Sequence, residues 1–206
     1  MGNALQKFGL AVRHQAGLFR LEAPTPSFLD CYLPLMQKLF EMRDSQPQGM
    51  IVAFTSVARG EGVSHVVASL ARKLAEHTWE QILVTTSAGL ANAASVKFDD
   101  SAQLQRLTRP GPLPSSARAV RWEDLQALRH RFGFVLVDCP ALRASPSMFT
   151  LSTLCDAAVL VVAAGEARRS EIEAAQKLLK ASSVKLLGMV LNKQTDPIPG
   201  FISKVL

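Results

Sequence analysis

The sequence predicts a single α/β fold, built on a mostly parallel β-sheet with helices on both faces. Short runs that are apolar throughout alternate along the chain with segments of helical periodicity. Strands of that kind are buried on both faces, which is typical of a parallel sheet between two layers of helices. Polar and glycine-containing segments follow several of the runs. Because ligands bind beyond the carboxyl ends of such strands, the functional residues are expected there.

The chain before the first apolar run is expected to begin with a flexible lead-in over residues 1–27, which ends in a proline-rich stretch. Ser27 is expected to cap a helix with one apolar side, formed by Phe28, Leu29, Tyr32, Leu35, Met36, Leu39 and Phe40. Pro34 falls inside that pattern and should start a new turn or kink the helix. Residues 28–194 are expected to form one domain, followed by a C-terminal tail over residues 195–206.

The apolar runs and the periodic segments give the order of the elements. Strands are predicted at residues 50–54, 82–86, 134–137, 157–163 and 186–191. A helix after the first strand carries its apolar residues at helical spacing, namely Val66, Val67, Leu70, Leu74 and Ala75. Further helices are predicted at residues 122–131 and 170–181. Residues 87–121 show little periodicity and hold three prolines around Gly111, so a loop with one short helix near 101–107 is expected.

The composition is that of a globular protein with a basic balance. Hydrophobic residues make up 48% of the 206 residues and the formal net charge is +6, which favours acidic partners such as an anionic membrane surface or a nucleic acid. The basic residues are scattered, so a solvated basic surface is the favoured interpretation. Cys31, Cys139 and Cys155 lack metal-site spacing and are expected to be reduced thiols in a reducing cytosol. No apolar run reaches the roughly 18–20 residues of a membrane span.

The segment Thr55–His65, which follows the first strand and opens a helix, has the character of a phosphate loop. Glycines let backbone N–H groups turn towards an anion, and a helix N-terminus adds positive potential. The motif also needs a lysine that reaches the phosphates, but Val63 stands at that position, and Val57 replaces the leading glycine. A glycine-containing strand-to-helix turn is the structural alternative. The candidate nucleotide-binding residues are Arg59, Gly60, Glu61, Gly62, Val63, Ser64 and His65.

Two later strand ends extend the candidate site and make the fold P-loop NTPase-like. Asp138 ends the third strand, where P-loop proteins place a carboxylate that holds Mg²⁺, so Ser64 and Asp138 are the candidate metal ligands. A turn aspartate before Pro140 is the alternative. Asn192 follows the fifth strand and is a further nucleotide-binding candidate. Its amide either contacts an adenine edge or closes a turn.

These motifs together resemble the cytoplasmic domain of the bacterial tyrosine-kinase family of polysaccharide synthesis, a relative of the MinD/ParA ATPases. The resemblance covers roughly residues 26–193 and is carried by Thr55-Ser56, by Gly60-Glu61-Gly62 with Ser64, by Gly111–Pro114, by Arg129–Pro140 and by Cys155–Asn192. It implies ATP or ADP with Mg²⁺ as ligands. It also implies a membrane partner, either a polysaccharide co-polymerase or a glycosyltransferase, and it allows a homo-oligomer.

The departures from the family pattern fall on its chemistry. Val63 stands where the family has its loop lysine, and Arg59 stands where the family has a proline before Gly60. The acids that the family carries after the second strand are missing from Thr85–Ala88. The oligomerisation helix keeps an acid but loses its arginine, and the C-terminal tyrosine cluster is absent, leaving Tyr32 as the sole tyrosine.

The resemblance and its departures together predict a catalytically degenerate accessory protein of bacterial exopolysaccharide synthesis and export, with no catalytic residue assigned. We expect it in the cytoplasm, at the inner face of the membrane through a partner, with ATP or ADP held weakly. One alternative is an active ATPase or tyrosine kinase that uses Arg59 and an acid from another subunit. Another is a MinD/ParA-like positioning protein. Nucleic acid is not an expected partner, because no basic amphipathic helix ends the chain.

Overall fold

The computed structural model describes residues 32–90, 97–107, 122–144, 154–182 and 184–193. Within them, six strands form one sheet in the order β3-β2-β4-β1-β5-β6, and every neighbouring pair is parallel. The strands are β1 (Met50–Ser56), β2 (Ile82–Thr86), β3 (Leu104–Leu107), β4 (Phe134–Asp138), β5 (Ala157–Ala163) and β6 (Lys185–Asn192). The helices are α1 (Leu33–Asp44), α2 (Val63–His77), α3 (Ser87–Leu90), α4 (Trp122–Arg131) and α6 (Arg169–Ala181).

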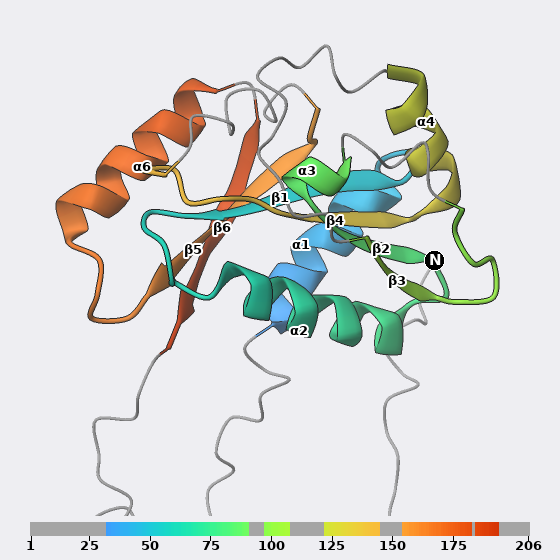
Figure 1. The fold of residues 1–206 in the computed structure, drawn as a ribbon, viewed down its shortest axis with the longest axis horizontal. Coiled ribbons are helices and arrows are strands. Elements are labelled where there is room, and N and C mark those ends of the chain that lie inside the picture. The colour runs from blue at the N-terminus through green and yellow to red at the C-terminus, as the bar shows by residue number, and fades with distance from the viewer. Residues whose placement is uncertain (1–31, 91–96, 108–121, 145–153, 183, 194–206) are drawn as a thin grey trace, which may run out of the picture.

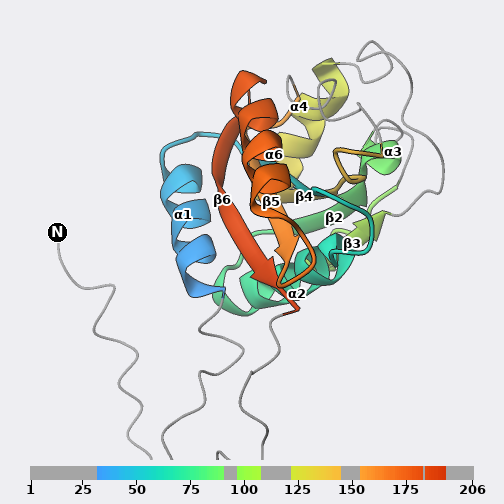
Figure 2. The ribbon, with the colours of Figure 1, turned by 90° about the vertical axis from the view of Figure 1, so that its left-hand side faces the viewer.

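Helices cover both faces of the sheet, which confirms the predicted architecture (Figure 1). Helices α1 and α2 pack on one face, while α3, α4 and α6 pack on the other. Figure 2 shows α1 and α6 on opposite sides of the edge strand β6. The central strand β1 is buried along its whole length, because its side chains alternate between the two cores. None of the described helices is long and apolar enough to cross a membrane.

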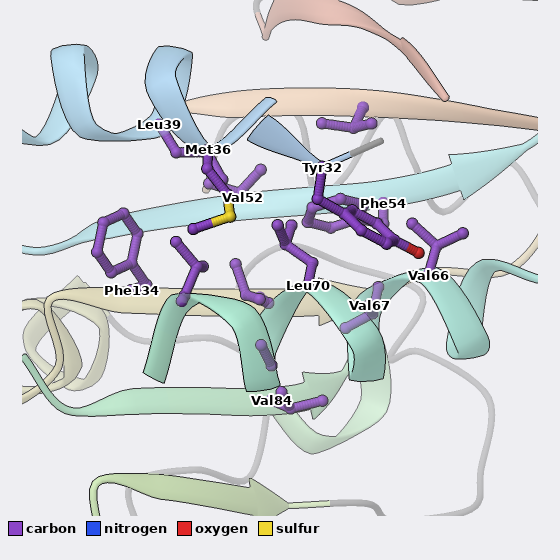
Figure 3. Close-up of a cluster of buried hydrophobic side chains, with 14 of the residues drawn as sticks. Tyr32, Met36, Leu39, Val52, Phe54, Val66, Val67, Leu70, Val84 and Phe134 are labelled. Carbon is purple, nitrogen blue, oxygen red and sulfur yellow. The ribbon is translucent and has the colours of Figure 1, made fainter. Parts of the chain in front are cut away.

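The core between α1, α2 and the sheet contains the sole tyrosine of the chain (Figure 3). Tyr32 is 6% exposed and lies just before α1. Its ring packs in the same cluster as Phe54 of β1 and Val66 of α2. The tyrosine therefore has a structural place in the core, and its ring is largely withdrawn from solvent.

One local prediction is wrong, one open alternative is settled, and others fall outside the described residues. The short helix expected near 101–107 is wrong, because residues 104–107 form strand β3 along the free edge of β2. The four-residue helix α3 was not predicted. Pro34 lies in the first turn of α1, where its missing N–H costs nothing, so it starts the helix. Ser27, the lead-in and the tail lie outside the described residues.

A largely buried ion pair links the amino-terminal ends of two strands to α4. Arg129 Nη1 lies 2.5 Å from Asp156 Oδ2, and the two side chains are 10% and 20% exposed. The same carboxylate oxygen accepts the Ile51 N–H at 2.7 Å, and Arg129 donates to the Gly49 carbonyl at 3.1 Å. The pair therefore holds the starts of β1 and β5 together.

The two described cysteines are buried free thiols, as predicted. Burial raises the pKa of the Cys155 thiol to about 12 and raises that of Cys139 well above its ordinary value. Both thiols are therefore protonated at neutral pH. Cys31 lies outside the described residues.

Candidate nucleotide-binding site

The loop between β1 and α2 owes its shape to two glycines. Gly60 and Gly62 have φ angles of 86° and 89°, in the left-handed region that side chains disfavour. Gly62 is also the N-cap of α2, a helix of 15 residues, so the loop ends at a helix N-terminus with positive potential. A Cβ atom on Gly60 would meet no atom within 4 Å, which leaves this backbone open to a ligand. The predicted strand–loop–helix arrangement is present.

The side chain of Glu61 stabilises the loop through hydrogen bonds to two backbone amides. Its side chain is buried, at 1% exposure, and one carboxylate oxygen accepts the Ala58 N–H at 2.8 Å. The other oxygen accepts the Ala163 N–H at the end of β5, at 3.3 Å. Both carboxylate oxygens are thus engaged by the fold, so the negative charge of Glu61 shapes the loop instead of facing a bound phosphate.

Asn192 holds the same loop from the end of β6. Its Nδ2 donates to the Glu61 carbonyl at 2.8 Å. A Cβ atom on Gly62 would lie 2.1 Å from this nitrogen, so a side chain there would displace the Asn192 amide from the loop. The Asn192 amide therefore contacts the backbone of the loop. This role differs from both alternatives expected from the sequence, a contact with adenine and the closure of a turn.

Replacing Glu61 by alanine is expected to lower the free energy of unfolding by about 2–4 kcal/mol, because two backbone N–H groups lose their acceptor. Glu61→Gln should cost less, since it keeps one acceptor oxygen. Urea denaturation of the purified variants measures both changes. Glu173→Ala is the matched control, because that side chain is 52% exposed in a surface ion pair. A Glu61→Ala cost no larger than that of the control would contradict this stabilising role.

Above the loop lies an open hollow of about 630 Å³ that contains most of the predicted residues. Ser64 and Asp138 meet at its edge, where the serine Oγ donates to the aspartate Oδ2 at 2.5 Å. Arg59 and His65 are exposed and line the same hollow. Asn192 does not line it. The full lining is Ser56, Arg59, Gly60, Glu61, Gly62, Val63, Ser64, His65, Thr86, Ser87, Ala88, Asp138, Cys139, Pro140 and Ala141.

The pair of oxygen ligands at Ser64 and Asp138 fits Mg²⁺ in part. This ion is commonly held by one or two carboxylates together with phosphate oxygens and water, and it neutralises phosphate charge when bound. Asp138 supplies one carboxylate, and Ser64 supplies a hydroxyl beside it. The end of β2 reaches the same hollow but contributes Thr86, Ser87 and Ala88, none of which is an acid.

Val63, at the lysine position of the motif, lies in the first turn of α2. The residue is 8% exposed and packs in the core cluster with Val66 and Phe54, while lining the hollow. A side chain at position 63 therefore packs partly in the core and partly faces the hollow. Valine fills the core part and brings no charge to the ligand side.

Asp138→Asn is expected to raise the Tm at pH 7. Burial raises the pKa of the Asp138 carboxyl above its ordinary 3.8, while the Ser64 hydrogen bond and the Arg106 charge oppose the rise. A raised pKa means that the folded protein keeps this proton to a higher pH than the unfolded chain. The group therefore lowers stability as pH rises through its pKa, and asparagine avoids that loss. Melting curves from pH 4 to 8 should show the difference between variant and wild type shrinking in acid. A lower Tm for the variant at pH 7 contradicts this.

Sequence reasoning missed one charged residue near the site. Arg106 lies on β3 and lines a smaller hollow of about 270 Å³ beside Ser64, Thr86 and Asp138. The segment was expected to be a short helix, so its side chains could not be assigned to a sheet face. The sequence offered no clear signal for this strand, because Leu104 and Leu107 stand three residues apart, as they would on one side of a helix.

Comparison with known sequences finds similarity to bacterial tyrosine kinases. No protein-family model matches it. The tyrosine-protein kinase CpsD of Streptococcus agalactiae is 26% identical over 182 residues, which cover 75% of this chain and 80% of that protein. The CpsD of Streptococcus pneumoniae is 35% identical over 69 residues, covering 34% of this chain and 30% of that protein. The chain is a homologue of these kinases.

Comparison with solved structures establishes the P-loop fold. The kinase domain of the Escherichia coli tyrosine kinase ETK superposes with a TM-score of 0.66 at 17% identity, covering 91% of this chain and 86% of that one. The kinase domain of VpsO gives 0.64 at 20% identity, over 81% and 94% of the two chains. The septum site-determining protein MinD of Pyrococcus horikoshii, complexed with Mg-ADP, gives 0.50 at 19% identity over 76% of each chain.

Proposed function

We propose that this homologue of bacterial tyrosine kinases is a catalytically degenerate accessory protein of bacterial exopolysaccharide synthesis and export. It acts by binding a membrane partner, and its loop holds a nucleotide weakly. The observation that carries the proposal is Val63, an uncharged side chain at the lysine position, packed in the core and lining the hollow above the loop.

The charge balance of the site supports weak turnover. Phosphoryl transfer depends on positioning and on neutralising the charge that spreads over the transferred group. Removing one electrostatic contact of this kind costs about 10²–10³ in rate. This site lacks the loop lysine, and the residues at the end of β2 bring no carboxylate to the hollow. Two such losses leave little catalysis for Ser64 and Asp138 to support.

The position of Tyr32 supports the same proposal. A tyrosine that accepts a phosphoryl group must present its hydroxyl to a second active site. Tyr32, the sole tyrosine of the 206 residues, is 6% exposed and packs under α1. Its phosphorylation would require the core between α1 and α2 to open.

The partner and the location follow from the family that the chain resembles. We propose a polysaccharide co-polymerase or a glycosyltransferase of the cell membrane as the partner, with the protein on the cytoplasmic side and able to self-associate. The net charge of +6 is compatible with a place beside an anionic membrane surface. Nucleic acid is not proposed as a partner, because the basic residues do not cluster along the sequence.

Phosphate release from ATP tests the proposal directly. The purified chain, with ATP and Mg²⁺, should release no more phosphate than its Asp138→Asn variant. Mg²⁺-dependent release that disappears in Asp138→Asn would contradict the proposal and favour the active ATPase or kinase. Calorimetric titration with ATP and ADP, with and without Mg²⁺, measures the expected weak binding. Cross-linking in cell membranes, followed by mass spectrometry, should capture a co-polymerase or a glycosyltransferase.

A further inference from the structure

The edge strand β3 brings a positive charge to the side of the candidate site. In the pairing of β3 with β2, Arg106 lies opposite Val84, whose side chain belongs to the core under α2. Arg106 and Leu104 accordingly line a surface hollow of about 420 Å³ together with Ala68, Ala71 and Arg72 of α2. The side chain of Arg106 therefore lies on the face of the sheet that α2 covers.

A second hollow connects Arg106 to the metal-ligand pair. This space of about 270 Å³ is lined by Arg106, by Val67 of α2 and by Ser64, Thr86 and Asp138. The last three residues also line the larger hollow above the loop. Arg106 therefore lies beside the place where phosphate oxygens would meet Ser64 and Asp138.

Arg106 also has a charge that is free to act on a ligand. Several other arginines in the described residues are held by carboxylates, as in the pairs Arg43–Glu80, Arg129–Asp156 and Arg143–Glu171. Arg59 is not among them, but it lines the larger hollow and not the one that holds Arg106. Within the part of the chain that the structure describes, Arg106 makes neither a hydrogen bond nor an ion pair.

We propose that Arg106 is the phosphate-binding cation of this site and replaces, from the edge of the sheet, the charge that Val63 cannot supply. The ligand is the diphosphate or triphosphate group of a nucleotide, held between the loop amides and the guanidinium. Arginine suits this task, because its planar fork donates two parallel hydrogen bonds to a phosphate and always carries a charge. The inference rests on the part of the proposed function in which the loop holds a nucleotide.

Calorimetric titration of the full chain with ADP and with pyrophosphate tests this assignment. Arg106→Ala should weaken the binding of both probes about tenfold or more, with Mg²⁺ or with EDTA, because a charge-assisted hydrogen bond is lost. Arg106→Lys should restore part of the affinity. Arg72→Ala is the matched control, since Arg72 shares the 420 Å³ hollow with Arg106 but not the one that contains Ser64 and Asp138. The Arg72→Ala variant should bind ADP and pyrophosphate as tightly as the wild type does. Melting curves confirm that each variant folds.

The outcomes separate this inference from the proposed function. It is overturned if Arg106→Ala binds as tightly as the wild type, if Arg72→Ala loses as much affinity, or if the wild type binds neither probe. In the first two cases the proposed function is unaffected. In the third case it loses the weak nucleotide binding, and the accessory role with little ATP turnover still stands. Conversely, ATP hydrolysis by the wild type would contradict the proposed function while leaving Arg106 as the phosphate-binding cation, provided that affinity depends on it.

Discussion

Replacing Val63 by lysine is expected to raise the affinity for ATP with Mg²⁺ by about tenfold to a hundredfold, the value of one hydrogen bond from a charged group. Val63 lines the hollow at the first turn of α2, and its buried part lies in the core. The methylene groups of a lysine would fill that core space while the ammonium reached the ligand. Calorimetric titration of wild type and variant measures the change.

The same variant should leave ATP turnover near background. Binding improves, but no carboxylate is added at the end of β2, where Thr86, Ser87 and Ala88 line the hollow. Val63→Met is the control for length, because methionine reaches out of the core without a charge and should bind ATP as the wild type does. An equal gain in affinity for both variants would show that the longer side chain, and not the added charge, raises the affinity. The degenerate-enzyme proposal fails if the wild type hydrolyses ATP and Val63→Lys leaves that rate unchanged.

Arg129→Met is expected to lower the free energy of unfolding by about 3–5 kcal/mol, the usual cost of removing one partner from a buried ion pair. The variant leaves the Asp156 carboxylate, 20% exposed, without its cation, and the Gly49 carbonyl without a donor. Methionine nearly matches the arginine stem in volume, so the loss reports on charge more than on packing. Urea denaturation at pH 7 measures it.

Two further variants make that measurement decisive. Arg129→Met combined with Asp156→Asn should recover part of the loss, since no buried charge is left unpaired. Arg169→Ala removes one partner of a surface pair with Glu173, whose side chains are 93% and 52% exposed, and should cost at most about 0.5 kcal/mol. If Arg129→Met costs no more than this surface variant, the Arg129–Asp156 pair does not hold the strand ends together.

The parts of the fold that depend on burial could be predicted from the sequence. Strand β1 is apolar at five successive positions and proves to be buried throughout, because it is the inner strand between β4 and β5. Ser64 and Asp138 could be paired before any coordinates, since the carboxyl ends of parallel strands face one edge of the sheet. Their hydrogen bond confirms that these two side chains meet.

The parts that depend on tertiary contacts could not be predicted. Strand β3 has four residues, two of them polar and none of them buried, so its pattern is too short and too mixed to distinguish a strand from a helix. Glu61 stands in the loop like a residue that faces the ligand, but its partner Ala163 is remote in the chain. Arg106 could be recognised as a site residue only after β3 was placed beside β2.

The hydrogen bonds of Glu61 and Asn192 also bear on the order in which the protein folds. Glu61 bonds to an amide 102 residues later, and Asn192 reaches back across 131 residues to the Glu61 carbonyl. Contacts so far apart in sequence close large loops, which costs chain entropy and slows folding. On the ribosome, the loop between β1 and α2 would emerge early and take its final shape only after β5 and β6 had been synthesised. The candidate nucleotide site is therefore expected to be among the last parts of the sheet edge to take its final shape, because it depends on the ends of both β5 and β6.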